Sequence, residues 1–207
     1  MATLLYIKAS PRERSKSTLV AEAFLEAYRA AHPDDTVKTL DIHTADLPSF
    51  DGPTVQAKYA ILHGEDHTPE QRKVWDRVEA IVAEFTAADK YLFSLPMWNF
   101  GIPYRLKQYI DILVQPGYTF SYSPEQGYTG LVNKPAAVVY ARGGDYSSKE
   151  AAVMDYQRPY LEAILGFMGV TVPYSIVVEP TLMGGAVQAQ QVIEAAAAQA
   201  KAAGEGF

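Results

Sequence analysis

Short apolar runs alternate along the chain with longer segments in which apolar residues recur every three or four positions. The runs fall at 3–8, 91–95, 135–141 and 175–179, and their length and composition are typical of strands buried in a sheet. Residues 36–41, which follow the turn Pro33-Asp34-Asp35, are expected to form a further strand. The segments between these strands predict amphipathic helices. Strands that alternate with helices favour an α/β fold, a parallel sheet whose right-handed crossovers place helices on both faces.

Five strands and about five helices fit a flavodoxin-like three-layer sandwich, with a five-stranded parallel sheet in the order 2-1-3-4-5. We expect one domain over residues 1–207, because no repeat or change of composition marks a linker. Ser17 or Thr18 is expected to cap the first helix. The run Thr68-Pro69-Glu70-Gln71 predicts a capping box with proline at the first helical position.

The loop after the third strand concentrates unusual side chains. Pro96 ends that strand, and Pro103 fits the first turn of the helix that follows. Between them stand one amide and three large apolar groups: Met97, Trp98, Asn99 and Phe100. Loops at the carboxyl ends of parallel strands build ligand sites, so this cluster suits a flat heteroaromatic ligand. By itself the cluster could equally cover a helix end or an interface.

Two more loops follow strands that the predicted order places beside this one. Residues 10–17 are rich in hydroxyls and precede a helix whose exposed N–H groups suit a phosphate. Residues 141–144 end in two adjacent glycines, which let main-chain N–H groups approach a ligand closely. Either loop alone is also typical of a helix cap or a plain turn. Together the three loops describe a mononucleotide that carries a flat ring, which points to FMN.

Composition excludes several kinds of chemistry. The 207 residues contain no cysteine, so disulfides, thiolate metal sites and thiol redox chemistry are ruled out. The four histidines show no metal-binding spacing, and we expect no metal. A net charge of -6 disfavours nucleic acid as a partner. No apolar run has the length of a membrane helix and no signal sequence is evident, so the expected location is cytoplasmic.

Several motifs resemble one known family. The run P-M-W-N-F-G-I-P, followed by L-K-Q-Y-I-D and then G-Y-T-F-S-Y, resembles FMN-dependent NADH-azoreductases and NAD(P)H:quinone oxidoreductases. K-A-S-P-R, A-R-G-G and P-Y-L-E-A-I-L-G-F-M-G-V extend the resemblance over nearly the full length. It implies a flavodoxin-like homodimer that binds FMN and takes electrons from NADH or NADPH.

The resemblance also implies roles for particular residues. The FMN phosphate would be held by Ser10, Ser15, Lys16 and Ser17. The isoalloxazine and ribityl chain would contact Met97, Trp98, Asn99 and Phe100. The far edge of the ring would be lined by Ala141, Arg142, Gly143 and Gly144. The substrate pocket would be shaped by Phe100, Tyr118, Phe120 and Tyr128, some of them closing the site of the opposite subunit.

The implied reaction is a two-electron transfer with ping-pong kinetics. NAD(P)H would deliver hydride to flavin N5 and leave, and a quinone or an aromatic azo compound would then take the electrons. The N–H groups of Gly143 and Gly144 would stabilise negative charge on the reduced ring. No catalytic side chain is required, although Tyr146 could assist by donating a proton or a hydrogen bond.

Three other kinds of protein are built on related α/β folds. A flavodoxin-type electron-transfer protein without an organic substrate is the main alternative, and the aromatic segment after Gly117 argues against it. A phosphoacceptor receiver would need acidic residues where the first strand ends in Lys8-Ala9-Ser10. A dinucleotide-binding Rossmann enzyme would carry a glycine fingerprint that this chain lacks.

Overall fold

A five-stranded sheet in the order β2-β1-β3-β6-β7 forms the centre of the computed structural model, which describes residues 1–207. All neighbouring strands in it are parallel. Its strands are β1 (Thr3–Lys8), β2 (Thr36–Asp41), β3 (Lys90–Pro96), β6 (Pro135–Ala141) and β7 (Thr171–Val178). The predicted order 2-1-3-4-5 is therefore confirmed, because the two remaining strands, β4 and β5, form a separate hairpin.

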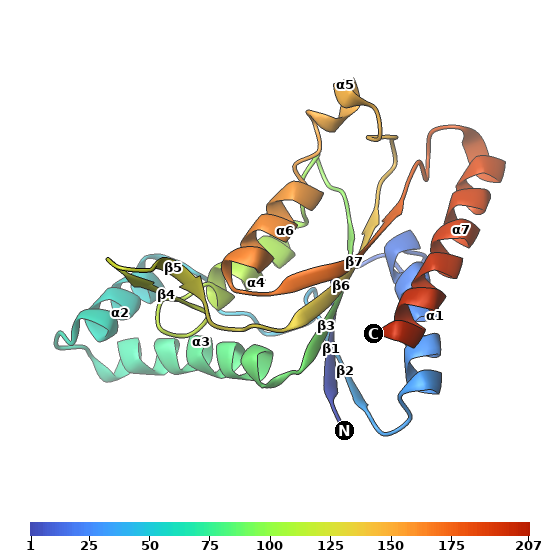
Figure 1. Ribbon diagram of the computed structural model, residues 1–207. Coiled ribbons are helices and arrows are strands. Elements are labelled where there is room, and N and C mark those ends of the chain that lie inside the picture. The colour runs from blue at the N-terminus through green and yellow to red at the C-terminus, as the bar shows by residue number, and fades with distance from the viewer.

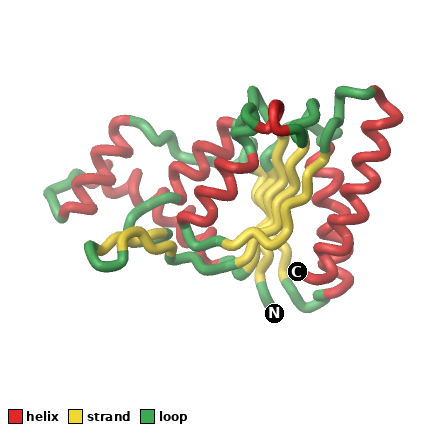
Figure 2. Tube along the Cα trace, turned by 45° about the horizontal axis from the view of Figure 1, so that its top comes forward, coloured by secondary structure: helices red, strands yellow, loops and turns green.

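Helices cover both faces of the sheet and complete three layers (Figures 1 and 2). One face carries α1 (Lys16–Ala31) and α7 (Gly185–Gly206), which pack side by side. The other face is covered by α2 (Gly52–His63), α3 (Pro69–Ala87), α4 (Tyr104–Leu113) and α6 (Arg158–Phe167). The short α5 (Lys149–Ala152) lies beyond the carboxyl ends of the strands (Figure 1). No helix combines the length and the hydropathy that a membrane span requires.

The sheet divides the apolar core into two clusters. The larger one contains 26 buried residues, among them Trp75 and Tyr109, and lies under α3, α4 and α6. The smaller one contains 17 and joins the sheet to α1 and α7 through residues such as Phe24 and Ala200. The central strands β1, β3 and β6 are buried on both faces, which explains their near-continuous apolar runs, whereas β2 and β7 at the edges of the sheet are partly exposed.

Local signals place most element ends correctly. The predicted capping box is present: Gln71 N–H donates to Thr68 Oγ1, and Thr68 N–H donates to the Gln71 side chain. The first helix differs, since Ser15 caps it in place of Ser17 or Thr18. Three candidate hydroxyls stand within four residues, and local sequence does not rank them.

Two further differences concern strands. The fifth sheet strand begins at Thr171 and not at Ser175, because Pro173 is tolerated on an edge strand that pairs with β6 alone. The aromatic segment after Gly117 forms an antiparallel hairpin of β4 (Phe120–Ser123) and β5 (Gly127–Gly130). Its base packs on α6, where Phe120 and Phe167 have ring centroids 4.7 Å apart.

Candidate functional site

The loops after β1, β3 and β6 meet at the carboxyl end of the sheet, where they enclose a cavity of about 210 Å³. This is the switch point of a flavodoxin-like order, where chain crossovers leave in opposite directions and expose the strand ends. The cavity is lined by Ser10, Arg12, Ser15, Lys16, Pro96, Met97, Trp98, Ala141, Gly143, Thr181 and Leu182.

The loop after β1 is arranged for an anion. Ser15 Oγ accepts the N–H of Thr18 at 3.3 Å and lies 3.0 Å from Ser17 Oγ, and both serines are buried. The main-chain N–H groups of Lys16 and Ser17, in the first turn of α1, donate to no group within the chain. Arg12 and Lys16 add positive charge at the same cavity. A helix N-terminus beside two cations favours a bound phosphate.

The loop after β3 is held in a strained conformation. Trp98 and Gly101 exchange two main-chain hydrogen bonds of 2.9 and 3.0 Å. This closes a tight turn in which Asn99 has a φ of 47° and Phe100 a φ of 68°. Two consecutive non-glycine residues in the left-handed region cost free energy and persist only where surrounding contacts impose them. Such strain is characteristic of ligand sites.

Trp98 stands between the first cavity and a second, larger one of about 680 Å³ on the outer side of the same loop. The second cavity is lined by Phe50, Trp98, Asn99, Gly101, Ile102, Tyr104, Lys107, Gln108, Asp111, Tyr156 and Tyr160. Six of the eleven lining residues are hydrophobic, most of them aromatic, and Asn99, Lys107, Gln108 and Asp111 add polar groups. Such a surface suits flat apolar molecules.

The loop after β6 supplies free main-chain donors. The N–H groups of Gly143, Gly144 and Asp145 donate to no group within the chain. The carbonyl of Gly143 accepts from Leu182 and Met183, each at 3.0 Å, which fixes the loop against the segment after β7. A side chain at residue 143 would meet Leu182, since an added Cβ would lie 2.9 Å from its Cδ1.

Arg142, in the same loop, does not line the cavity with its side chain. The guanidinium is 3% exposed and lies 2.7 Å from Asp155 Oδ2 and 3.4 Å from Glu179 Oε2. Tyr146 stands edge-on to Phe100, with ring centroids 6.4 Å apart, and its N–H donates to Glu179. Tyr146, the residue expected to assist, thus lies near the loop after β3.

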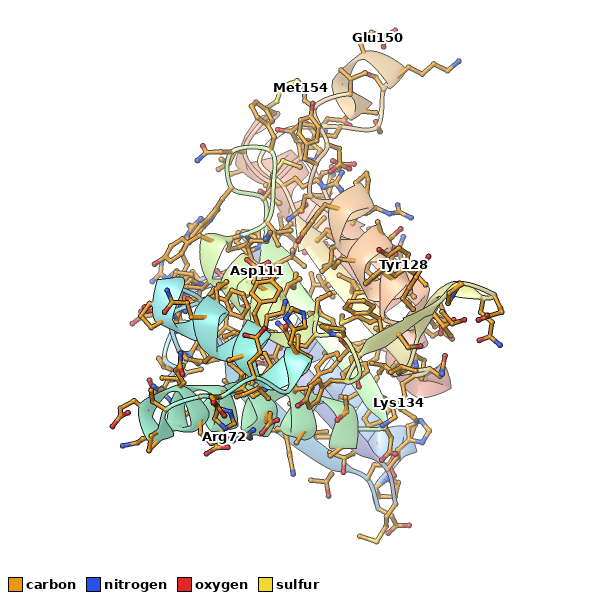
Figure 3. The ribbon with its side chains drawn as sticks, turned by 90° about the vertical axis from the view of Figure 1, so that its left-hand side faces the viewer. Arg72, Asp111, Tyr128, Lys134, Glu150 and Met154 are labelled. Carbon is orange, nitrogen blue, oxygen red and sulfur yellow. The ribbon has the colours of Figure 1, made fainter.

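The structure brings most of the predicted cofactor residues together and separates part of the predicted substrate pocket. Phe100 belongs to the turn beside the cavities but lines neither of them, and Tyr118 donates to Glu79 on α3. Phe120 and Tyr128 pack on Phe167. Figure 3 shows Tyr128 on the hairpin, well apart from the segment of Met154 and Glu150 beyond the strand ends. Within one chain the hairpin aromatics therefore do not line the cavity beside Phe100.

Sequence reasoning missed several residues at this end of the sheet. Thr181 and Leu182 line the first cavity, and Tyr156 lines the second. None of them belongs to a motif, and each reaches the site from a segment far along the chain. The single available signal is that Thr181 and Leu182 directly follow the last strand, so topology alone places them at the switch point.

The donor set fits FMN. A phosphate matches the cations and free N–H groups at the start of α1, and a flat ring matches Met97, Trp98 and Leu182. The free N–H groups of Gly143 and Gly144 match polar atoms on the edge of such a ring. The loops thus supply groups that match the phosphate, the flat ring and the polar edge of the ring.

Known proteins are similar to this chain over nearly its full length. A family model described as flavodoxin-like fold matches residues 2–203. The chain is 53% identical over 204 residues to the FMN-dependent NADH:quinone oxidoreductase of Nitratidesulfovibrio vulgaris (strain DP4), and the match covers 97% of each protein. It is 42% identical over 207 residues to the FMN-dependent NADH:quinone oxidoreductase 3 of Pseudomonas fluorescens, covering 98% of this chain and 95% of the relative.

Solved structures are similar over the whole chain as well. The azoreductase from Bacillus anthracis strain Sterne superposes with a TM-score of 0.92 at 34% identity and covers 100% of both chains. The FMN-dependent NADH-azoreductase from Bacillus anthracis strain Ames Ancestor, solved in complex with FMN, has a TM-score of 0.89 at 27% identity. That match covers 99% of this chain and 98% of the other.

Proposed function

The chain belongs to the flavodoxin-like family, and from this membership we propose that it is an FMN-dependent enzyme that transfers two electrons from NADH to quinones and aromatic azo compounds. One observation carries the proposal: a loop with cations and free N–H groups, a loop with apolar side chains and a loop with free main-chain N–H groups meet at the switch point of the sheet. Relatives at 53% and 34% identity are named for these two activities.

The roles of the chain's own groups follow from the site. Lys16 and the first turn of α1 bind the phosphate, and Trp98 provides an apolar surface for the ring. The N–H groups of Gly143 and Gly144 hold negative charge at the edge of the ring. When bound, FMN would supply the redox chemistry, namely hydride acceptance from NADH and two-electron donation to the acceptor.

Absorption spectroscopy tests the proposal directly. The purified protein, incubated with FMN and freed of excess, is expected to be yellow, to bleach with NADH in the absence of oxygen, and to regain colour with a quinone. A protein that stays colourless would refute the cofactor. A protein that binds FMN but does not oxidise NADH under turnover would instead be an electron shuttle.

Ping-pong kinetics form part of the proposal, because NADH and the acceptor would use the same surface beside Trp98 in turn. Double-reciprocal plots of rate against NADH at several fixed quinone concentrations are then expected to be parallel. Intersecting lines would show that both substrates bind together. The same assay with an azo dye ranks the two classes of acceptor.

We also propose that the enzyme acts as a cytoplasmic homodimer. The hairpin aromatics lie apart from Phe100 within one chain, so they join the substrate site only if a second copy supplies them. Large apolar side chains that line the second cavity are also exposed, among them Tyr104 at 69% and Tyr156 at 61%. Sedimentation analysis is expected to give twice the mass of the chain, and a monomer would contradict the proposal.

A further inference from the structure

The side chain of Arg142 is turned into the protein, away from the cavity that its neighbours line. Its Nε donates to Gln157 Oε1 at 3.0 Å. Its Nη2 lies 2.7 Å from Asp155 Oδ2, in an ion pair whose N–H does not point straight at the oxygen. Its Nη1 lies 3.4 Å from Glu179 Oε2. One buried cation thus meets side chains from two other segments of the chain.

Those two segments belong to the candidate site. Glu179 directly follows β7, and two residues later Thr181 donates both its N–H and its hydroxyl to the carbonyl of Arg142, at 2.9 and 2.8 Å. Glu179 Oε2 also accepts the N–H of Tyr146 at 3.1 Å. The loop that carries the free N–H groups of Gly143 and Gly144 is therefore fastened on both sides of those glycines.

The other segment reaches the strained loop after β3. Asp155 is followed by Tyr156, whose N–H donates to the carbonyl of Phe100 at 3.0 Å. Phe100 has a φ of 68°, a conformation that surrounding contacts must impose. The Arg142 side chain forms an ion pair with Asp155, and the next residue, Tyr156, makes the hydrogen bond that restrains the loop after β3. The Asp155–Tyr156 pair thus connects Arg142 to this loop.

A contribution to stability alone does not explain why the Arg142 side chain is buried with these partners. Burying an arginine beside two partly buried carboxylates costs desolvation free energy, and apolar replacements of similar volume are often as stable. The arrangement does fix the orientation of the neighbouring groups, because a guanidinium presents its donors in a rigid planar fork. Its three partners are held at fixed angles, which an ammonium group, acting as a point charge, could not impose.

On these contacts we infer that Arg142 is a positioning residue. It fixes the Gly143–Gly144 N–H donors and the Asn99–Phe100 turn in the relative positions that the cofactor requires, and it does not contact the cofactor itself. The inference rests on the proposed function, since it takes FMN as the ligand. It differs from the expectation drawn from the family resemblance, in which Arg142 lines the ring.

Three substitutions in the full-length protein test this role. Arg142→Lys keeps the buried positive charge and removes the fork. Asp155→Asn keeps Oδ1, which caps α6 by accepting from Gln157 and Arg158 at 3.0 and 3.1 Å, and removes the charge facing Arg142. Arg158→Lys is the matched control, because Arg158 makes an exposed ion pair with Glu162 at 2.9 Å. FMN affinity is measured by fluorescence titration, together with the visible spectrum and the melting temperature.

Arg142→Lys is expected to weaken FMN binding about tenfold and to shift the visible absorption bands of bound FMN, at a temperature where the variant is fully folded. Asp155→Asn is expected to act in the same direction, and Arg158→Lys to leave both readouts unchanged. If Arg142→Lys does not fold, Asp155→Asn decides the question alone.

A lower melting temperature with unchanged FMN affinity and spectrum would show that Arg142 only stabilises the fold, and would overturn the inference. A wild-type protein that bound no FMN would refute the proposed function, and this role with it. Wild-type binding together with unchanged binding by Arg142→Lys would refute the positioning role alone.

Discussion

Phe100 illustrates how a single residue can be placed against its own conformational preference. Its φ of 68° is unfavourable for any residue with a Cβ, and its side chain is 42% exposed, so little burial offsets the strain. A residue kept in such a conformation on a cavity-lining loop is better explained by ligand binding than by stability.

Replacing Phe100 by glycine is expected to separate these two effects. Phe100→Gly and Phe100→Ala both remove the ring, but glycine adopts a positive φ without strain, so it should be more stable than alanine by about 1 kcal/mol. Chemical denaturation measures the difference. Both variants should lose activity, since both lack the aromatic surface. Equal stability of the two would show that the turn relaxes and stores no strain.

Lys16 offers a test of the phosphate site. If its ammonium group and the start of α1 bind the phosphate, Lys16→Gln should weaken FMN binding by roughly fivefold and leave riboflavin binding unchanged, because riboflavin has no phosphate. Lys38→Gln, at an exposed position on β2, is the control. An equal loss of affinity for both flavins would place the phosphate elsewhere.

At the scale of elements, α1 and α7 pack closely because a glycine lies between them. Gly204 is buried on α7, and an added Cβ would lie 2.3 Å from the carbonyl oxygen of Phe24 on α1. The pair of helices covers one whole face of the sheet and so forms one wall of the smaller core cluster. Their spacing also positions the first turn of α1, which belongs to the site.

Gly204→Ala is expected to lower the free energy of unfolding by about 1–3 kcal/mol, because a methyl group cannot be accommodated without moving a helix. Gly166→Ala is the matched control. Gly166 is exposed on α6 with nothing within 4 Å of an added Cβ, so alanine should stabilise that helix slightly. Thermal denaturation followed by circular dichroism measures both. Similar effects of the two changes would contradict the close contact.

At the scale of the whole molecule, buried tyrosines make stability sensitive to alkaline pH. Burial raises the pKa of Tyr6 to about 12 and raises the pKa values of Tyr91, Tyr109 and Tyr140 as well. In the unfolded chain these groups titrate near pH 10. The folded state therefore holds protons that the unfolded state releases, and stability falls as pH rises.

The free energy of unfolding is accordingly expected to be constant with respect to these groups below about pH 10 and to decrease from there towards pH 12. Absorbance of tyrosinate near 295 nm follows the titration. The exposed tyrosines should ionise first and the buried ones, Tyr28 among them, only on unfolding, whereas in guanidinium chloride all 14 should titrate together. A single transition near pH 10 in the folded protein would contradict the burial of these hydroxyls.

The amino-acid sequence by itself determined the sheet and its order. Strands buried on both faces produce continuous apolar runs, and helix caps such as Thr68 with Gln71 act over three or four residues, so both are visible locally. Three loops with distinct chemistry at successive strand ends then predicted one ligand site, because parallel strands end at the same edge.

Only the tertiary structure decided which way side chains turn at that site. Arg142 meets Glu179 and Thr181, which are 37 and 39 positions along the chain, so nothing in its own segment indicates that its guanidinium is buried. The hairpin aromatics are near Phe100 in sequence but pack on α3 and α6. The orientation of a side chain and the identity of its partners depend on contacts between distant segments, which local sequence patterns do not encode. The hydrophobic periodicity that predicts strands and helices, in contrast, is present within each segment.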